Sequence, residues 1–162
     1  MKIKILAHND LCKPIVIDKG DWIDLRSEEE VHIKAPTVID DKIVFDKKKI
    51  SLGISVKMPK GYEMIALPRS STPDKYSILL CNSSGVIDNS YCGNDDKIMF
   101  NALGIDDAVI NVGDRIAQFK VQLSQKATVI QKLKWLFSNK IKIEFVKQLN
   151  DENRGGFGST GR

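Results

Sequence analysis

Short runs of alternating apolar and polar residues, separated by turn signals, make up most of the chain. An alternation with a period of two places every second side chain on the same face, as in a half-buried β-strand. Strands this short and this frequent predict an all-β sandwich, barrel or jelly roll. The predicted strands are Lys2–Leu6, Pro14–Ile17, Val31–Lys34, Lys42–Phe45, Lys49–Met58, Tyr62–Leu67, Ser77–Leu80, Val86–Ile87, Lys97–Phe100, Ala108–Asn111, Arg115–Leu123 and Lys140–Phe145, with a further apolar strand within Gly20–Leu25.

Two segments have helical signals. Thr72–Lys75 has a capping residue followed by proline at the first helical position, which predicts one or two turns. Within Ala127–Asn139, the apolar residues recur at helical spacing and predict an amphipathic helix. This apolar stripe consists of Val129, Ile130, Leu133, Leu136 and Phe137. Trp135 points away from the stripe, so it either contacts another subunit or lies flat at the edge of the core.

The chain divides into one β domain, residues 1–149, and a C-terminal tail, residues 150–162. From Asn150 onward the apolar periodicity stops, and four glycines lie within residues 155–161. Such a composition predicts a flexible segment, although Phe157, Ser159 and Thr160 are unusual in a purely solvated tail.

Composition narrows the class of protein. The 162 residues, of which 42% are hydrophobic and 28% charged, suit one globular domain with a real core. No apolar run approaches the ~18 residues that span a bilayer, and the N-terminus lacks the apolar stretch of a signal peptide. Cys12, Cys81 and Cys92 match no metal-ligand spacing, so we expect free thiols and a cytoplasmic protein.

Among the charged residues, the arginines are the most informative about function. Lysine and arginine exceed aspartate and glutamate by 25 to 21, but the lysines are scattered and predict neither a nucleic-acid surface nor a membrane surface. Arginine is the cation that holds oxyanions in a rigid fork. The five arginines are Arg26, Arg69, Arg115, Arg154 and Arg162.

Three segments could carry chemistry. Pro68–Thr72 places Arg69 beside two hydroxyl residues at a helical turn, which is either an anion cradle or a capped surface turn. Asn82–Gly93 is a predicted hairpin in which Asp88 is either a general base or an Asx-turn residue. In Gly113–Gln118, a turn leads into a strand, with a possible Asp114–Arg115 ion pair and with Gln118 facing solvent or a ligand.

These segments, together with Gly20–Leu25 and the glycine-rich tail, resemble the five ordered motifs of the trimeric dUTPase family, and most of all the short dUTPases of bacilli and their phages. The most specific matches are Gly85–Gly93 and Arg154–Gly161. The resemblance implies a dUTPase-like jelly roll, or β-clip, with one or two short helices, assembled as a homotrimer with shared active sites. It also implies hydrolysis of dUTP to dUMP and pyrophosphate, which limits uracil in DNA and supplies dUMP for dTMP synthesis.

The resemblance assigns roles to residues of the hairpin. Asp88 matches the carboxylate that activates the water attacking the α-phosphorus, and Tyr91 matches the ring that packs on the deoxyribose. Asp96 is expected to contact the substrate. The residues expected to read uracil are Asn82, Gly85, Val86 and Ile87. His8 and His32 lie outside every motif, which independently favours a carboxylate base.

The remaining motifs match the part of the family site that holds the triphosphate. Asp24 is expected to reach, through water, a Mg²⁺ ion that the triphosphate itself mainly holds, because Mg²⁺ prefers oxygen ligands and keeps several waters. Phe157 matches the ring that stacks on uracil. The expected phosphate contacts are Arg69, Ser70, Ser71, Gln118, Arg154, Gly158, Ser159 and Thr160.

Two other functions stay open at this stage. A dCTP deaminase shares the fold, although the Phe157–Gly161 tail argues against it. A nucleotide-gated module that binds a regulatory protein could use the same scaffold. The segments Ala35–Lys49 and Ala127–Asn139, which look inserted, could supply the surface for such a partner or simply enlarge the trimer.

Overall fold

The computed structural model describes residues 1–16, 20–138 and 140–155, and it confirms the predicted all-β fold. The larger sheet has the strand order β13-β1-β6-β10-β8. Its strands are β1 (Lys2–Ala7), β6 (Lys47–Lys57), β8 (Ile78–Leu80), β10 (Lys97–Gly104) and β13 (Lys142–Phe145). Residues 50–56 of β6 are all buried, so this central strand is covered on both faces. β13 pairs with β1 in parallel, whereas the other pairs in this sheet are antiparallel.

The second sheet carries the candidate site and has the order β2-β12-β7-β9. Its strands are β2 (Ile23–Arg26), β7 (Tyr62–Pro68), β9 (Gly85–Asp88) and β12 (Arg115–Leu123). All of its pairs are antiparallel, with β7 between β12 and β9. Apolar side chains from both larger sheets form one buried core, to which Ile54 of β6 and Phe119 of β12 contribute fully buried side chains.

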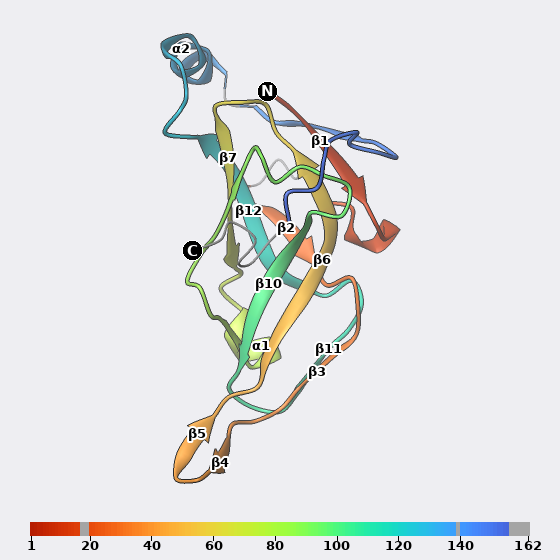
Figure 1. Ribbon diagram of the computed structural model, residues 1–162, viewed down its shortest axis with the longest axis vertical. Coiled ribbons are helices and arrows are strands. Elements are labelled where there is room, and N and C mark those ends of the chain that lie inside the picture. The colour runs from red at the N-terminus through yellow and green to blue at the C-terminus, as the bar shows by residue number, and fades with distance from the viewer. Residues whose placement is uncertain (17–19, 139, 156–162) are drawn as a thin grey trace.

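The smaller elements surround these sheets. They are η1 (Asp10–Cys12), β3 (Val31–Ile33), β4 (Thr37–Ile39), β5 (Lys42–Val44), α1 (Thr72–Tyr76), β11 (Ala108–Ile110) and α2 (Val129–Phe137). Figure 1 shows α2 at one end of the molecule and the β4–β5 hairpin at the opposite end. No helix in the described part of the chain has the length and apolar character needed to cross a bilayer. Cys12, Cys81 and Cys92 are free thiols, as predicted.

Two strand predictions need correction. Pro14–Ile17 was expected to be a strand, but residues 14–16 form none, and Ile17 lies outside the described residues. Ile15 and Val16 are exposed, so their apolar character does not reflect packing in a sheet. Conversely, β4 was missed because its side chains are all exposed and give no alternation signal. The β4–β5 hairpin turns at Asp40 and Asp41, whose φ values of 48° and 58° lie in the left-handed region that two-residue hairpins use.

The predicted helix near residue 130 is present as α2, and Trp135 takes the second of its two predicted positions, at the edge of the core. The apolar stripe, from Val129 to Phe137, is 52–85% exposed. Trp135 instead packs on Tyr62 of β7, with ring centroids 5.7 Å apart, and lies at the edge of the core. The helix is held from its N-terminal end, where Thr128 caps it and Gln131 donates a hydrogen bond to the carbonyl oxygen of Lys60.

The buried centre of β6 makes a direct test of this core. Ile54 is fully buried, so Ile54→Ala should lower the free energy of unfolding by about 2–5 kcal/mol through lost apolar burial and a residual cavity. Ile43→Ala, at a site that is 66% exposed, is the matched control and should change it by less than about 0.5 kcal/mol. Urea unfolding followed by circular dichroism measures both. Equal losses in the two variants would contradict the assigned core.

Candidate active site

One group of charged side chains surrounds the carboxylate of Asp24 on β2. Its Oδ1 atom lies 2.7 Å from Nε of Arg69, which follows β7, and its Oδ2 atom lies 3.1 Å from Nη1 of Arg115. Gln118 lies opposite Asp24 in the β2–β12 register and donates a hydrogen bond to the carbonyl oxygen of Pro68. Two guanidinium groups against one carboxylate give this Asp24 cluster a net positive charge, which suits an anion.

Arg115 is the member of the Asp24 cluster that the sequence did not assign. Its neighbour Asp114 was considered as an ion-pair partner, but Asp114 accepts a hydrogen bond from the backbone N–H of Asn111 instead. The pairing of β2 with β12 shifts register between Arg115 and Ala117. A register shift is not visible in the local pattern of residues, so only the paired strands reveal that Arg115 reaches Asp24.

The loop after Arg69 displays the two predicted phosphate-binding serines. Ser70 and Ser71 are both exposed, at the entrance to α1. Thr72 anchors the loop, because its hydroxyl accepts a hydrogen bond from the backbone N–H of Arg69 and donates one to the carbonyl oxygen of Ile116. The structure therefore brings Arg69, Ser70 and Ser71 together on a loop tied to β12.

A second group lies at the end of β9, around Asp88. Oδ1 of Asp88 accepts hydrogen bonds from the backbone N–H and the hydroxyl of Ser90, at 2.7 and 2.5 Å. This is the Asx-turn contact that the sequence left open. Oδ2 lies 2.7 Å from Nη1 of Arg154, which comes from the C-terminal segment. We call these three residues the Asp88 cluster.

The environment of Asp88 favours its ionised form. Partial burial acts to raise the pKa of this carboxyl, but the hydrogen bonds from Ser90 and the charge and hydrogen bond of Arg154 outweigh it and lower the pKa. The side chain is still 48% exposed, so solvent reaches the carboxylate. Asp88 is therefore a charged, accessible acceptor for a proton.

Tyr91 and Asp96 both lie near the Asp88 cluster, but they differ in how deeply they are buried. Tyr91 is half-buried, and its hydroxyl donates a hydrogen bond to the carbonyl oxygen of Lys97. Burial and the nearby charge of Asp96 raise the pKa of this hydroxyl, which keeps it neutral. Asp96 is only 1% exposed, so the structure places its carboxylate behind the surface of the site.

The C-terminal segment reaches Asp88 because it is tied to the turn after β9. We call residues 149–155 the strap. The backbone N–H of Leu149 donates to Oδ1 of Asn94, and the side chain of Asn153 exchanges two hydrogen bonds with Asp95. Asp151 forms an ion pair with Lys57. The described residues of the predicted tail are therefore docked on the β domain.

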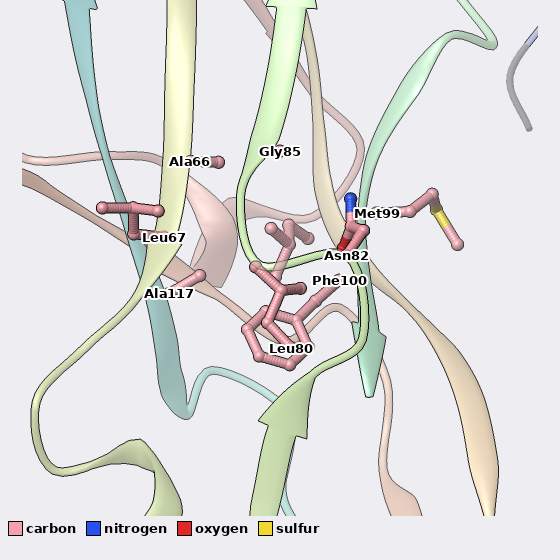
Figure 2. Close-up of a pocket in the computed structure, with 9 residues that line it drawn as sticks. Ala66, Leu67, Leu80, Asn82, Gly85, Met99, Phe100 and Ala117 are labelled. Atoms are coloured by element: carbon pink, nitrogen blue, oxygen red, sulfur yellow. The ribbon is translucent and has the colours of Figure 1, made fainter. Parts of the chain in front are cut away.

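A small pocket opens at the other end of β9 (Figure 2). It is a shallow recess with a cavity volume of about 10 Å³. Asn82 and Gly85 belong to the segment that was predicted as a hairpin, and Figure 2 shows both beside the loop that joins β8 to β9. The hairpin prediction is wrong, because β8 pairs with β10 in the larger sheet whereas β9 pairs with β7 in the second sheet, so the segment crosses between sheets. The other lining residues are apolar: Leu52, Ala66, Leu67, Leu80, Met99, Phe100 and Ala117. An apolar lining with one amide has the chemistry that suits a planar heterocycle.

The two clusters lie at opposite ends of β7. Asp88 pairs with Glu63 at one end of this strand, whereas Arg69 follows Pro68 at the other end. At about 3.3 Å per residue, the six residue steps from Glu63 to Arg69 span roughly 20 Å. One copy of the chain therefore does not place the Asp24 cluster and the Asp88 cluster around the same phosphate.

The structure thus brings the predicted residues together in two groups and a pocket. Val86 and Ile87 lie on β9 between the pocket and Asp88. The predicted contacts Phe157, Gly158, Ser159 and Thr160 lie outside the described residues.

Comparisons with known proteins agree with the residue pattern. The family model described as dUTPase matches residues 23–161. The SPbeta prophage-derived deoxyuridine 5'-triphosphate nucleotidohydrolase YosS of Bacillus subtilis is 38% identical over 145 residues, covering 90% of this chain and 87% of the relative. The deoxyuridine 5'-triphosphate nucleotidohydrolase of Helicobacter pylori is 34% identical over 165 residues, covering 99% of this chain and 97% of the relative.

Solved structures show the same fold. The dUTPase from Streptococcus mutans superimposes with a TM-score of 0.65 at 20% identity, covering 79% of this chain and 99% of that chain. The D95N mutant dUTPase from phage phi11 of S. aureus, a structure that describes the coordination of a structural Mg(II) ion, has a TM-score of 0.61 at 17% identity and covers 78% and 94%.

The contacts of Asp88 predict how its carboxyl titrates. In the folded chain its pKa lies below the usual value, so the carboxyl stays charged to a lower pH than the ~3.9 of a free aspartate. The stability that this adds is present above the unfolded-state pKa and is lost as the pH falls through the folded-state pKa.

Arg154→Ala and Ser90→Ala should each raise the pKa of Asp88, because each removes a hydrogen bond to the charged form. The carboxyl ¹³C chemical shift of Asp88, followed against pH, measures this. Ser124→Ala, in the turn after β12, is the control. A titration midpoint that neither Arg154→Ala nor Ser90→Ala moves would contradict the assignment.

Proposed function

The chain belongs to the dUTPase family and is a dUTP diphosphatase, and we propose that Asp88 activates the water that attacks the α-phosphorus of dUTP. The products are dUMP and pyrophosphate. The observation that carries this proposal is the position of Asp88: a charged, solvent-accessible carboxylate at the end of β9, one strand length from a pocket lined by Asn82 and Gly85.

The segment that contains β9 orders the parts of the nucleotide. The pocket at Gly85 takes the uracil, where the amide of Asn82 and the backbone of β9 supply donors and acceptors for its polar edge. Val86 and Ile87 continue β9 toward the phosphates. Tyr91, anchored through its hydroxyl to Lys97, forms the wall that the deoxyribose packs against and leaves no room for a 2′-hydroxyl. Base, sugar and α-phosphate then follow β9 in order.

Arg154 couples substrate binding to the strength of the base. With Arg154 in place, Asp88 has a lowered pKa, and a carboxylate of lower pKa is a weaker general base. The triphosphate competes for the guanidinium, since a bidentate contact with phosphate is stronger than a single contact with a partly exposed carboxylate. When Arg154 moves to the terminal phosphate, Asp88 loses its ion pair and its basicity increases.

The Asp24 cluster binds the phosphate chain. Arg69, Arg115 and Gln118 present donors that match phosphate oxygens, and Ser70 and Ser71 add hydroxyl groups on the same loop. Positive groups at this position stabilise the charge that develops on the leaving pyrophosphate. Beyond the described residues, we assign Phe157 to stacking on uracil and Gly158, Ser159 and Thr160 to further phosphate contacts.

The donor set fits a Mg²⁺ ion that arrives with the substrate. Among the described residues, no group of three or more His, Cys, Asp or Glu side chains could form a metal cage. Mg²⁺ keeps several waters and is commonly held by substrate phosphates, where it neutralises their charge. Asp24 would reach such a hydrated ion through water once its arginines turn to the phosphates.

The roughly 20 Å of strand from Glu63 to Arg69 supports a shared site. A triphosphate that reaches both Asp88 and Arg69 needs the two residues from different copies of the chain. A closed ring of three copies gives each copy one such neighbour on each side, and homotrimers are typical of the family. We therefore propose a homotrimer in which each site combines the Asp88 cluster of one copy with the Asp24 cluster of the next. We place the reaction in the cytoplasm, where free thiols persist.

Pyrophosphate release across dUTP, dTTP, dCTP and UTP tests the substrate. We expect turnover of dUTP and little of the others, since the pocket excludes other bases and Tyr91 excludes a 2′-hydroxyl. Asp88→Asn should lower turnover by about 10²–10⁴-fold while dUTP still binds in equilibrium measurements. Asp106→Asn, an exposed carboxylate in the loop after β10, is the matched control. Near-normal turnover in Asp88→Asn, or a uracil nucleotide formed from dCTP, would contradict the proposal.

Mixing two inactive variants tests the shared site. Arg69→Ala and Asp88→Asn chains, unfolded together and refolded in equal amounts, should recover about a quarter of wild-type turnover, because random assembly gives that fraction of sites both intact residues. Each variant refolded alone measures the background. If the mixture stays at that background while both variants form trimers, Arg69 and Asp88 do not serve one site from different copies.

A further inference from the structure

The carboxylate of Asp96 is buried between the strap and the turn that follows β9. Its side chain is 1% exposed. Oδ2 accepts hydrogen bonds from the backbone N–H groups of Gly93, at 2.9 Å, and Arg154, at 2.8 Å. Oδ1 accepts one from the backbone N–H of Gly155, at 2.9 Å. A buried carboxylate is strongly unfavourable unless such hydrogen bonds replace its water, and these three do so.

Two of the three donors are consecutive residues of the strap. Because the N–H groups of Arg154 and Gly155 both point at one carboxylate, the backbone direction at Arg154 is set by Asp96. From this position of the backbone, the Arg154 side chain extends to Asp88, where its Nη1 atom lies 2.7 Å from Oδ2. The buried carboxylate and the exposed candidate base are thus linked through a single residue of the strap.

The other strap contacts are made by residues that precede Arg154. Leu149 is held by Asn94, and Asn153 by Asp95. These contacts dock the strap, but they leave the N–H groups of Arg154 and Gly155 to Asp96. Gly93 completes the arrangement, since a Cβ at this position would lie 2.5 Å from Cα and 2.7 Å from the backbone nitrogen of Asn153. The strap therefore passes directly over the backbone of Gly93.

We infer that Asp96 is a positioning residue of this dUTPase, which acts on the nucleotide only through Arg154. It holds the Arg154–Gly155 backbone over the end of β9. The Arg154 guanidinium therefore lies beside Asp88 before the nucleotide binds, and it moves to the phosphate chain while its backbone stays in place. This inference rests on the proposed function, because it assigns Arg154 to the phosphates of dUTP. It also explains why a carboxylate occupies a site without access to substrate: an apolar side chain would leave three N–H groups unsatisfied.

Asp96→Asn is the first test. The amide nitrogen of asparagine cannot accept a hydrogen bond, so at least one of the three contacts is lost without a change in shape. We expect faster amide hydrogen exchange in peptides that cover residues 149–155, unchanged exchange in β6, and a decrease in dUTP turnover of about tenfold. Asp106→Asn is the control for removing a charge from the surface.

Gly93→Ala is a second variant that leaves Asp96 intact. Its added methyl group meets Asn153 and should displace the strap by itself, so it gives the same pattern of exchange and turnover if Asp96→Asn fails to fold. A double-mutant cycle then separates positioning from general stability. If Asp96 acts through Arg154, Asp96→Asn combined with Arg154→Ala is no slower than Arg154→Ala alone, and the same holds for Gly93→Ala.

The outcomes distinguish the two proposals. Strap exchange that Asp96→Asn leaves unchanged, or turnover losses that multiply in the double variants, would overturn the role of Asp96 while dUTP hydrolysis by the wild type stands. A wild-type protein that releases no pyrophosphate from dUTP would overturn the proposed function. The hydrogen-exchange measurement would still decide whether Asp96 holds the strap.

Discussion

The antiparallel pairing of β7 with its two neighbours determines the layout of the functional groups. β9 pairs along one edge of β7 and carries Asp88 to the Glu63 end, whereas β12 pairs along the other edge and carries Gln118 to the Pro68 end. A strand is an almost inextensible spacer at about 3.3 Å per residue. The separation of the two clusters therefore follows from hydrogen-bond register, and it is the ground on which we propose that several copies of the chain form each site.

Within each of the two clusters, the charged side chains are paired with one another. Each candidate phosphate-binding arginine has a carboxylate partner in the free chain: Arg69 and Arg115 share Asp24, and Arg154 pairs with Asp88. Such partly exposed pairs contribute little stability and exchange readily. They keep the guanidinium groups oriented while leaving them free to turn to phosphate. Asp96 differs, because its hydrogen bonds come from backbone N–H groups of the strap and of the turn after β9.

Much of the fold could be predicted from local patterns. β1, β6, β10 and β12 bury alternate or continuous apolar residues, and their sequence patterns show it directly. The errors occur at segments where the burial of the residues does not follow from their apolar and polar pattern. Residues 14–16 are apolar without pairing in a sheet, and β4 is paired without being buried. The helix α2 was predicted, as was the position of Trp135 at the edge of the core as one of two alternatives, but only the structure shows that the apolar stripe is exposed.

The residue types and their order along the chain determined the family, the reaction class and the identity of the groups, because the chemistry of a motif is contained in its side chains and their spacing. Tertiary structure alone decided which groups meet. Arg115 joins Asp24 through a register shift, Arg154 reaches Asp88 from 66 positions away in the chain, and Asp96 lies behind the site rather than on it. These contacts join segments that are far apart in sequence. The distance between such segments in the folded chain depends on strand pairing and burial, and a local pattern of residues does not predict it.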